Sequence, residues 1–326
     1  MRIFFILVAF LCLAVSPARA AEPAKVYVGA HVSDIREVDL QSHSYRMDLY
    51  IWFRWNDPAI DPSQSAEIMN AFDPADHVRT PLYEEPQEMP DGSRYMIFRV
   101  QGKFSSKFPL QMYPFDRQTL TVAMEDTVHP ASELVYVPDT NASAPVSMNG
   151  NVRLPGFDIG KPAIAVSAFP YMTNFGDLSQ PDKASYSRAV FSVPVERPWM
   201  ATGIKVFLPV ILVLLCTSFV FLVHPAYIEG RLGVAITALL TLVALQLTSA
   251  SGMPEVDYLL MTDKIYLLSY LFIIVTLMQV VRSSGFVHAK KYTEVMAGDR
   301  RALVAFVSLL VAGAAVIFVT TLKGAP

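Results

Sequence analysis

The stretch FPLQMYPFDRQTL, residues 108–120, decides how the rest of the chain is interpreted. Its two aromatic–proline pairs, Phe108-Pro109 and Tyr113-Pro114, flank a short loop, and Asp116 follows just before an apolar strand pattern at Thr119–Met124. A carboxylate among apolar residues needs a partner, because an uncompensated buried charge is costly. The sequence therefore predicts a cationic partner for Asp116 elsewhere in the chain.

The first twenty residues have the pattern of an export signal. The basic start Met1-Arg2 is followed by an apolar run, Ile3–Val15, and by the small-x-small site Ala18-Arg19-Ala20. This pattern predicts a secretory signal peptide over residues 1–20, with an uncleaved anchor helix as the alternative. Of the two cysteines, Cys12 leaves with the signal, so no internal disulfide is expected in the mature protein.

Residues 21–198 have the pattern of an immunoglobulin-like β-sandwich. Short runs rich in Val, Tyr, Phe and Ile alternate with polar residues and are punctuated by Pro, Gly, Asn and Asp. This region carries 23 Asp and Glu against 15 Lys and Arg, a net charge of −8. The clearest predicted strands are Tyr45–Trp55, Arg94–Phe104, Thr119–Met124, Ala163–Phe169 and Tyr186–Val195.

Residues 199–326 have the composition of a membrane domain. The chain is 53% hydrophobic and only 17% charged, against roughly 25% charged in soluble domains. Basic residues crowd the stretch 282–301, whereas 252–263 has acids and no Lys or Arg, so the positive-inside rule places the former in the cytoplasm. Four spans are predicted, at about residues 203–223, 231–252, 262–282 and 301–322.

Several classes of function have no support in the sequence. It contains no phosphate-binding loop, no GxSxG motif, no zinc-ligand spacing and no basic patch for nucleic acid. We therefore expect neither an enzyme nor a nucleic-acid-binding protein, and no cofactor.

The second predicted span carries a mixed stripe of acidic, small, hydroxyl and leucine residues. At about 100° per residue its members fall within about 80° of one another on a helix. Repeated around a ring of subunits, such a stripe would line a water-filled pore, with carboxylates at the inner mouth and leucines as dewetting gates. Ordinary helix packing is the alternative, as is a local ion pair between Glu229 and Arg231. The mixed stripe consists of Glu229, Gly233, Thr237, Leu240, Ala244, Leu247 and Ser251.

These features together resemble the pentameric ligand-gated ion channels, the Cys-loop receptor superfamily, in their prokaryotic form. Tyr113–Gln118 is similar to the family's aromatic-Pro-Phe-Asp-x-Gln motif, and Trp55-Asn56-Asp57 to its Trp-x-Asp. Arg197-Pro198-Trp199 resembles the entry to the first membrane helix, with Pro209 inside it, and Glu229–Pro254 aligns with the pore helix. The resemblance implies an α+β membrane protein, in which a periplasmic β-sandwich (21–198) precedes a four-helix transmembrane bundle (199–326), assembled as a homopentamer in a bacterial inner membrane.

The chain also departs from the family pattern. The paired cysteines would fall at Ser106 and Leu120, and the Trp-x-Pro segment of the binding site has no clear counterpart. The region Glu125-Asp126-Thr127, where receptors often place an aromatic residue, is acidic. An altered or lost agonist site is therefore among the expectations.

The resemblance also implies how the two domains communicate. The turn Pro114–Asp116 would lie at the foot of the sandwich and press on the loop Gly252–Tyr258. Asp116 would pair with Arg197, and Asp39 could join this pair. A stabilising ion pair without a role in gating is the alternative. The implied coupling residues are Asp39, Tyr113, Pro114, Phe115, Asp116, Arg197, Pro254 and Tyr258.

By the same resemblance, a ligand would bind between subunits behind a hairpin at about Tyr171–Tyr186. Tyr171, Phe175 and Tyr186 would cage a cation beside Glu125 and Asp126, or else pack the core. Protons are a further candidate agonist. An acidic loop is a candidate calcium site, and a solvated surface loop without a metal is the alternative. The loop holds Glu84, Glu85, Glu88 and Asp91.

The expected function is a ligand-gated, cation-selective channel of five identical subunits that contacts membrane lipid and conducts monovalent cations. Five Glu229 side chains and an acidic vestibule would concentrate cations. The alternatives are a poorly conducting membrane receptor, and a periplasmic binding domain on an unrelated four-helix transporter subunit.

Overall fold

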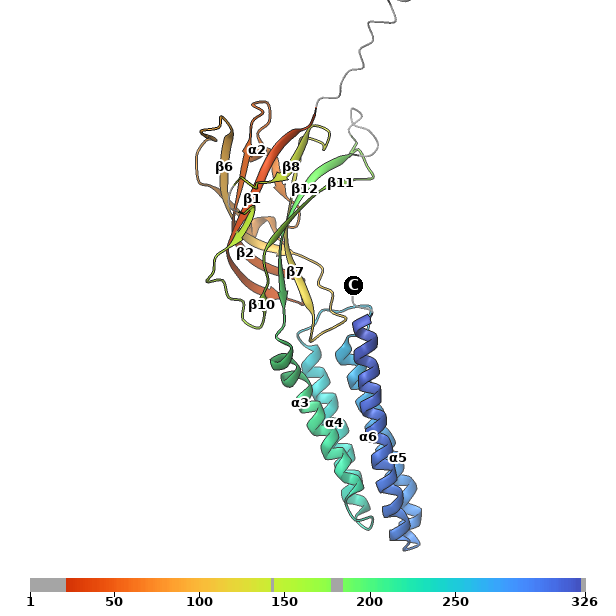
Figure 1. The fold of residues 1–326 in the computed structure, drawn as a ribbon. Coiled ribbons are helices and arrows are strands. Elements are labelled where there is room, and N and C mark those ends of the chain that lie inside the picture. The colour runs from red at the N-terminus through yellow and green to blue at the C-terminus, as the bar shows by residue number, and fades with distance from the viewer. Residues whose placement is uncertain (1–21, 142–143, 177–183, 324–326) are drawn as a thin grey trace, which may run out of the picture.

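The computed structural model describes residues 22–141, 144–176 and 184–323, so the predicted signal peptide lies outside the described residues. A sandwich of two β-sheets stands on one end of a bundle of four long helices, and the carboxyl end of the last helix lies at the junction between them (Figure 1). The predicted fold class, a β-sandwich followed by a four-helix bundle, is confirmed.

The first sheet holds seven strands among the described residues, with the path β4-β6-β2-β1-β8 and with β5 on β6 and β9 on β1. Its strands are β1 (Ala24–Asp39), β2 (Ser44–Trp55), β4 (Val78–Pro81), β5 (Gln87–Glu88), β6 (Arg94–Ser105), β8 (Leu134–Pro138) and β9 (Val146–Met148). β1 pairs antiparallel with β2 and parallel with β8 and β9.

The second sheet holds five strands among the described residues, with the path β10-β12-β7-β3 and with β11 on β12. Its strands are β3 (Ala66–Ile68), β7 (Arg117–Asp126), β10 (Asp158–Ile159), β11 (Ala163–Pro170) and β12 (Ser185–Glu196). Two short helical turns, α2 (Pro62–Ser65) and η1 (Pro74–Asp76), lie on either side of β3 in the chain. The five strands predicted from alternation are β2, β6, β7, β11 and β12, each with ends within two residues of the prediction.

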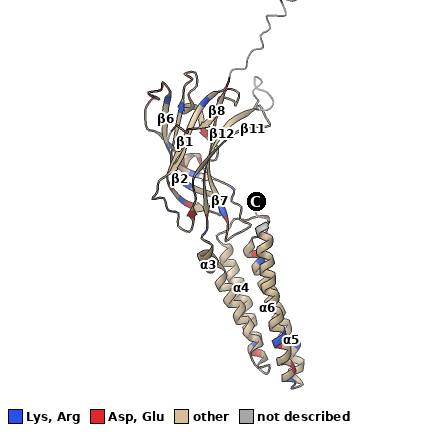
Figure 2. Cartoon of the chain, in the orientation of Figure 1, with Lys and Arg blue, Asp and Glu red and all other residues tan. Residues whose placement is uncertain are grey.

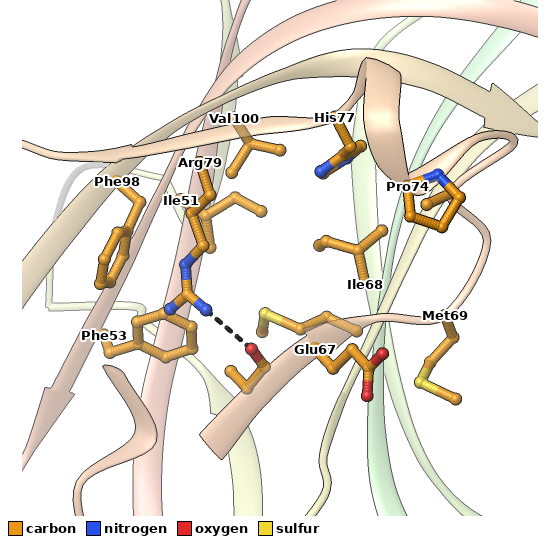
Figure 3. A pocket seen from close by; sticks show the side chains of 13 residues that line it. Ile51, Phe53, Glu67, Ile68, Met69, Pro74, His77, Arg79, Phe98 and Val100 are labelled. Atoms are coloured by element: carbon orange, nitrogen blue, oxygen red, sulfur yellow. Dashed lines mark hydrogen bonds between the residues drawn. The ribbon is translucent and has the colours of Figure 1, made fainter. Parts of the chain in front are cut away.

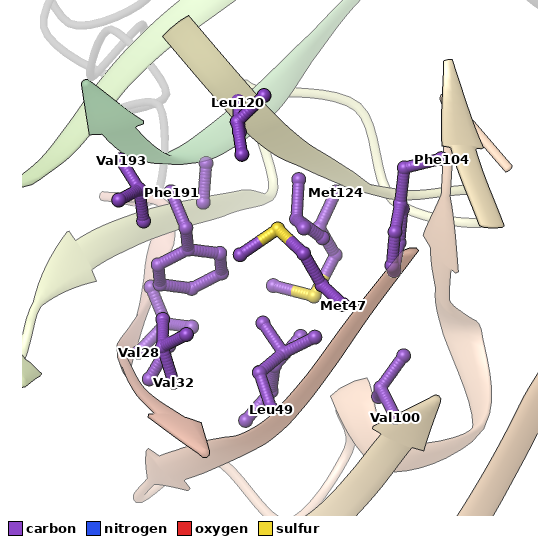
Figure 4. Packing of buried hydrophobic residues seen from close by; sticks show 14 of the residues in the cluster. Val28, Val32, Met47, Leu49, Val100, Phe104, Leu120, Met124, Phe191 and Val193 are labelled. Carbon is purple, nitrogen blue, oxygen red and sulfur yellow. The ribbon is translucent and has the colours of Figure 1, made fainter. Parts of the chain in front are cut away.

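Alternation along the strands builds the core between the sheets. On β2 and β6 every second side chain is buried, because successive residues of a strand point to opposite faces. Met47 and Leu49 of β2 meet Leu120 and Met124 of β7, and Phe191 of β12 closes the layer (Figure 4). This packing makes the sandwich a rigid body that can transmit a displacement from one end to the other.

The membrane domain consists of α3 (Trp199–Ser218, continued by the 3₁₀ turn η2, Phe219–Phe221), α4 (Ile228–Ala250), α5 (Met261–His288) and α6 (Tyr292–Lys323). All four helices are long and apolar enough to cross a bilayer. Charged residues are spread over the sandwich but are nearly absent from the middle of the bundle (Figure 2). The long loop expected over 282–301 is instead mostly helical, because α5 and α6 extend until only residues 289–291 separate them.

Candidate pore and coupling junction

The mixed stripe of α4 is exposed along its whole length in the single chain. Leu240 and Leu247 are 65% and 68% exposed, and the other members of the stripe are exposed as well. The buried residues of α4 are Arg231, Ala235, Ala238 and Leu242. Their mean direction lies about 170° from that of the stripe, so the bundle packs on the opposite face of the helix.

The exposed residues of the stripe differ in chemistry from those of the neighbouring helices. α3 exposes Leu208, Ile211, Leu212 and Leu215, and α6 exposes Val304, Leu309, Val311, Val316 and Phe318, as suits a surface in contact with lipid. The stripe instead combines a carboxylate, a glycine and hydroxyls with two leucines. Lipid is a poor solvent for such a face, which favours water or a neighbouring subunit as its surroundings.

Glu229 does not pair with Arg231. The Arg231 guanidinium turns into the bundle and meets Asp299 of α6 at 2.6 Å, whereas Glu229 forms no ion pair with any described residue. Residues two positions apart on a helix differ by about 200° around its axis, so the Glu229 and Arg231 side chains leave α4 on opposite sides. The local ion pair considered as an alternative from the sequence is therefore wrong.

The loop of residues 108–116 connects the sandwich to the bundle. The Leu110 N–H donates to the Tyr258 hydroxyl at 3.1 Å, and the Met261 N–H donates to the Gln111 carbonyl at 3.0 Å. Met253, Val256 and Tyr258, on the segment between α4 and α5, pack on the sandwich core. The outer end of the pore-helix candidate is thus tied to this loop, and Pro254 lies half-buried in the same segment.

Phe115 inserts its ring among the membrane helices. It contacts Phe207 of α3 and Phe318 of α6, with ring centroids 6.0 and 6.4 Å apart. A Cβ at Gly203 of α3 would lie 3.1 Å from the Phe115 ring, so the glycine permits this close approach. The loop therefore contacts α3 and α6 directly through this ring.

Asp116 lies beside the partner that the resemblance implied. Its Oδ1 accepts from Arg197 Nε at 3.0 Å and its Oδ2 from Gln118 Nε2 at 2.8 Å, with the carboxylate side chain fully buried. Arg197 also lies over the rings of Tyr113 and Phe157, 5.4 and 4.5 Å from the centroids. Because Arg197 follows β12 and precedes α3, this ion pair joins the loop to the entry of the first membrane helix. Burial raises the pKa of Tyr113, which stays neutral beneath the guanidinium.

Asp39 does not join this pair among the described contacts. Its carboxylate accepts from the Ser42 hydroxyl and from the N–H groups of Gln41 and Ser42, and the Ser42 hydroxyl lowers the pKa of Asp39. His43 instead connects the β1–β2 turn to the loop: Phe108 N–H donates to its Nδ1 at 3.1 Å, and Ser106 N–H to its carbonyl at 3.0 Å. Sequence reasoning missed His43, whose only signal was its place in the turn before β2.

The five residues expected at the ligand site lie together. Glu125, Asp126, Tyr171, Phe175 and Tyr186 line one pocket of 370 Å³, with Met69, Thr127, Val128 and Asn174. The Tyr171 ring lies 5.2 Å from Phe175 and 5.9 Å from Tyr186, and burial raises the pKa of Tyr171. The aromatic residues therefore face a shared cavity instead of packing the core.

Both acids of this pocket already have partners. Glu125 is paired with Arg188 and accepts from the Tyr171 hydroxyl at 2.8 Å. Asp126 is fully buried and accepts from the His129 N–H at 2.7 Å, from the His129 ring at 3.0 Å and from the Ser65 hydroxyl. Arg188 in turn lies 3.4 Å over the Phe169 ring. The carboxylates are thus structural parts of the pocket wall.

A second cavity, of 340 Å³, lies between the sheets (Figure 3). Arg79 donates there to the Ala66 and Ser63 carbonyls at 2.8 and 2.7 Å and lies 3.9 Å over Phe98. Burial lowers the pKa of both Arg79 and His77, since an apolar surrounding disfavours the charged form. Nothing in the sequence patterns had indicated this cavity.

Comparison with known proteins gives relatives of one kind. No family model matches the chain. A proton-gated ion channel of Gloeobacter violaceus is 20% identical over 278 residues, 81% of this chain and 74% of the relative. The acetylcholine receptor subunit beta of Xenopus laevis is 23% identical over 298 residues, 81% of this chain and 58% of the relative. The glutamate-gated chloride channel subunit beta of Haemonchus contortus is 23% identical over 176 residues, 53% of this chain and 38% of the relative.

The chain is a homologue of the pentameric ligand-gated ion channels. It spans less than two thirds of the length of these animal relatives. With its four apolar helices, this channel homologue is a multi-pass membrane protein, and its relatives are channels, not enzymes.

In this channel homologue the acidic loop is not a built metal site. The described residues contain no group of three or more His, Cys, Asp or Glu side chains that could hold a metal ion. Glu84, Glu85 and Glu88 are exposed, and Asp91 binds Arg54 at 3.2 Å and the Ser93 N–H at 3.0 Å. The geometry favours the solvated-loop alternative.

Proposed function

We propose that the chain forms a homopentameric cation channel whose pore is lined by the mixed stripe of α4 and whose opening is controlled by the β-sandwich. The observation that carries the proposal is the orientation of α4: the stripe is exposed while the opposite face, with Arg231, is buried. Closure of five chains into a ring would give these exposed polar groups water and would place the two leucines as narrow apolar rings across the same pore.

Cation selectivity rests on Glu229. It is the only acid on the stripe, and it is free of any ion pair with the described residues, so five carboxylates would ring the inner mouth. A ring of fixed negative charge raises the local concentration of cations and repels anions. One relative is a chloride channel by name, so the relatives do not decide whether cations or anions are conducted. The Glu229 carboxylate is the feature that supports cations.

A chain of contacts within the structure supports a route from ligand to gate. Tyr186 of the pocket and Arg188, the partner of Glu125, lie on β12, which ends at Glu196. The next residue, Arg197, binds Asp116. The loop of Asp116 reaches α3 and α6 through Phe115, and the segment after α4 through Tyr258. A ligand that shifts β12 would therefore move the outer end of α4. We assign the agonist to the pocket of Tyr171, Phe175 and Tyr186.

Protons are the second stimulus to test, because one relative is proton-gated by name. Three sandwich carboxylates are unsuited to sensing mild acid. The pKa of Asp39 is lowered by Ser42, that of Asp48 by Arg99 and that of Asp76 by Arg46. A group with a lowered pKa keeps its charge until the pH falls below its usual range.

We place the protein in a bacterial inner membrane, with residues 1–20 as the signal peptide, 21–198 in the periplasm and 199–326 in the bilayer. The basic residues near the short link between α5 and α6 support this orientation, because that link lies at the end of the bundle away from the sandwich (Figure 1). They are Arg282, Lys290, Lys291, Arg300 and Arg301.

We expect Glu229→Ala to lower the cation-to-anion permeability ratio by about tenfold, because it removes five charges from the inner mouth. The measurement is the reversal potential of purified protein in planar bilayers under a KCl gradient, with pH steps and a small-molecule library as stimuli. Glu294→Ala is the matched control: this exposed acid of α6 pairs with Lys291 at 3.3 Å and lies off the stripe.

The control should leave the ratio unchanged. An unaltered ratio in Glu229→Ala would assign selectivity elsewhere in the protein. Ligand binding without current would favour the poorly conducting receptor, and a stable monomer or dimer would favour the transporter subunit.

A further inference from the structure

A buried polar node joins all four membrane helices at the end of the bundle away from the sandwich. The Arg231 guanidinium of α4 donates to Asp299 of α6 at 2.6 Å and, through Nε, to the Val220 carbonyl of η2 at 3.0 Å. Gln279 of α5 approaches the other Asp299 oxygen at 3.4 Å. The side chains of Arg231 and Asp299 are 0% and 1% exposed. We name these four residues the inner node.

A buried ion pair in a membrane domain is costly to break. Ionisable side chains within a membrane domain are expensive unless they pair with one another, and removal of one partner leaves a buried charge uncompensated. The inner node also cannot follow α4 if the helix turns about its axis, because the guanidinium is held by two acceptors on different elements. The node therefore resists rotation of the first turns of α4.

The node lies directly behind the candidate selectivity residue. Arg231 follows Glu229 by two residues, a rise of about 3 Å and a turn of about 200° along the helix. When the guanidinium is fixed inside the bundle, the Glu229 carboxylate is fixed on the opposite, exposed side. The positive charge of Arg231 is at the same time neutralised by Asp299, so that permeating ions would not sense it.

We propose that Arg231 and Asp299 are positioning residues for ion selectivity: their ion pair sets the direction in which Glu229 faces the pore. This inference rests on the proposed function, since it assumes that Glu229 lines the inner mouth. It adds a cause for the orientation of Glu229 that lies outside the pore and involves all four helices.

The test uses the full-length protein and two variants of different kinds, one double and one single. In Arg231→Met with Asp299→Leu the pair becomes apolar, which preserves packing and is compatible with assembly. In Arg231→Lys the charge remains but the planar fork that binds two acceptors is lost. Arg282→Met is the control, because it removes an exposed basic residue of α5 at the same end of the bundle.

Two measurements distinguish positioning from stability alone. The first is the permeability ratio, which should fall by about threefold or more in both node variants and stay unchanged in Arg282→Met. The second is the rate at which a charged thiol reagent modifies Glu229→Cys in a Cys216→Ser background. We expect this rate to fall by about tenfold when the node is made apolar, because the thiol turns away from the water-filled pore.

Node variants that assemble as five-membered rings with unchanged permeability and unchanged modification would overturn the proposal. If the apolar double variant does not assemble, the same two measurements on Arg231→Lys decide the question, since this variant keeps the charge pair. A failure of the proposed function is distinguishable: Glu229→Cys would then be unreactive toward the reagent, or without effect on current, even when the node is intact.

Discussion

Leu240→Thr is expected to produce current without a stimulus, or to lower the stimulus for half-maximal opening by about tenfold. Leu240 lies near the middle of α4 and is 65% exposed on the same face as Glu229. A ring of five leucines offers an ion nothing to replace its water, so a narrow pore dries and closes there. Five hydroxyls would keep the water column continuous. Single-channel recording at zero stimulus measures the effect.

The control for this prediction is Val234→Thr, which makes the same chemical change on an exposed residue about 100° from the centre of the stripe. It should leave gating unchanged. Leu247 is the rival gate, two turns nearer the outer mouth. If Leu247→Thr opens the channel and Leu240→Thr does not, the gate lies at Leu247; if neither has an effect, the assignment of the stripe to the pore is wrong.

The second large effect is expected at the junction. Asp116→Asn and Arg197→Gln should each raise the stimulus for half-maximal opening by about tenfold or abolish the response, because each leaves a buried charge without its partner. In a double-mutant cycle on gating, the two changes should show a coupling energy on the order of 1 kcal/mol or more. Additive effects among variants that assemble would mean that the ion pair has no role in gating.

A neighbouring ion pair supplies the matched control. Arg117 and Glu196 join the ends of the same two strands, β7 and β12, at 2.9 Å, but their side chains are 84% and 53% exposed. Exposed pairs contribute little, since water screens both charges. The cycle of Arg117→Gln with Glu196→Gln should therefore give a coupling energy near zero. Equal coupling in the two cycles would point to strand pairing, and not to the buried pair, as the source of the effect.

Strands were predictable where one face is regularly buried. β6 alternates without interruption, β2 does so apart from the buried Ser44 and Asp48, and the sequence located both to within one residue. β1, the longest strand, was not among the strands identified from sequence. Its alternation breaks where the register shifts between Val32 and Asp34, so the period of two is lost in the middle of the strand.

The stripe of α4 was predictable from spacing, because a helix brings residues three and four apart onto one side. The partner of Arg231 was not. Asp299 lies 68 residues later, in a stretch that looked like a charged cytoplasmic loop, and only the packing of α4 against α6 brings the two together. Sequence distance of this size leaves several partners equally plausible, among them the nearby Glu229.

The pocket proposed for the ligand shows the same limit. The sequence indicated that Glu125, Asp126 and the three aromatic residues would gather, and the structure brings them into one pocket. It did not indicate that Arg188 and His129 would occupy both carboxylates. Whether a carboxylate is paired depends on residues that other strands bring beside it, and the composition of the sequence does not specify those neighbours.

The proposed function requires that the mixed stripe of α4 faces an ion pathway. Cysteine scanning along α4 in a Cys216→Ser background, with a charged thiol reagent applied during bilayer recording, tests it most directly. We expect the reagent to change the current at positions 233, 237, 240, 244 and 247 and to have no effect at 235, 238 and 242, whose side chains are buried in the bundle. Block confined to the buried face, or no change at any position of the stripe while the channel conducts, would contradict it.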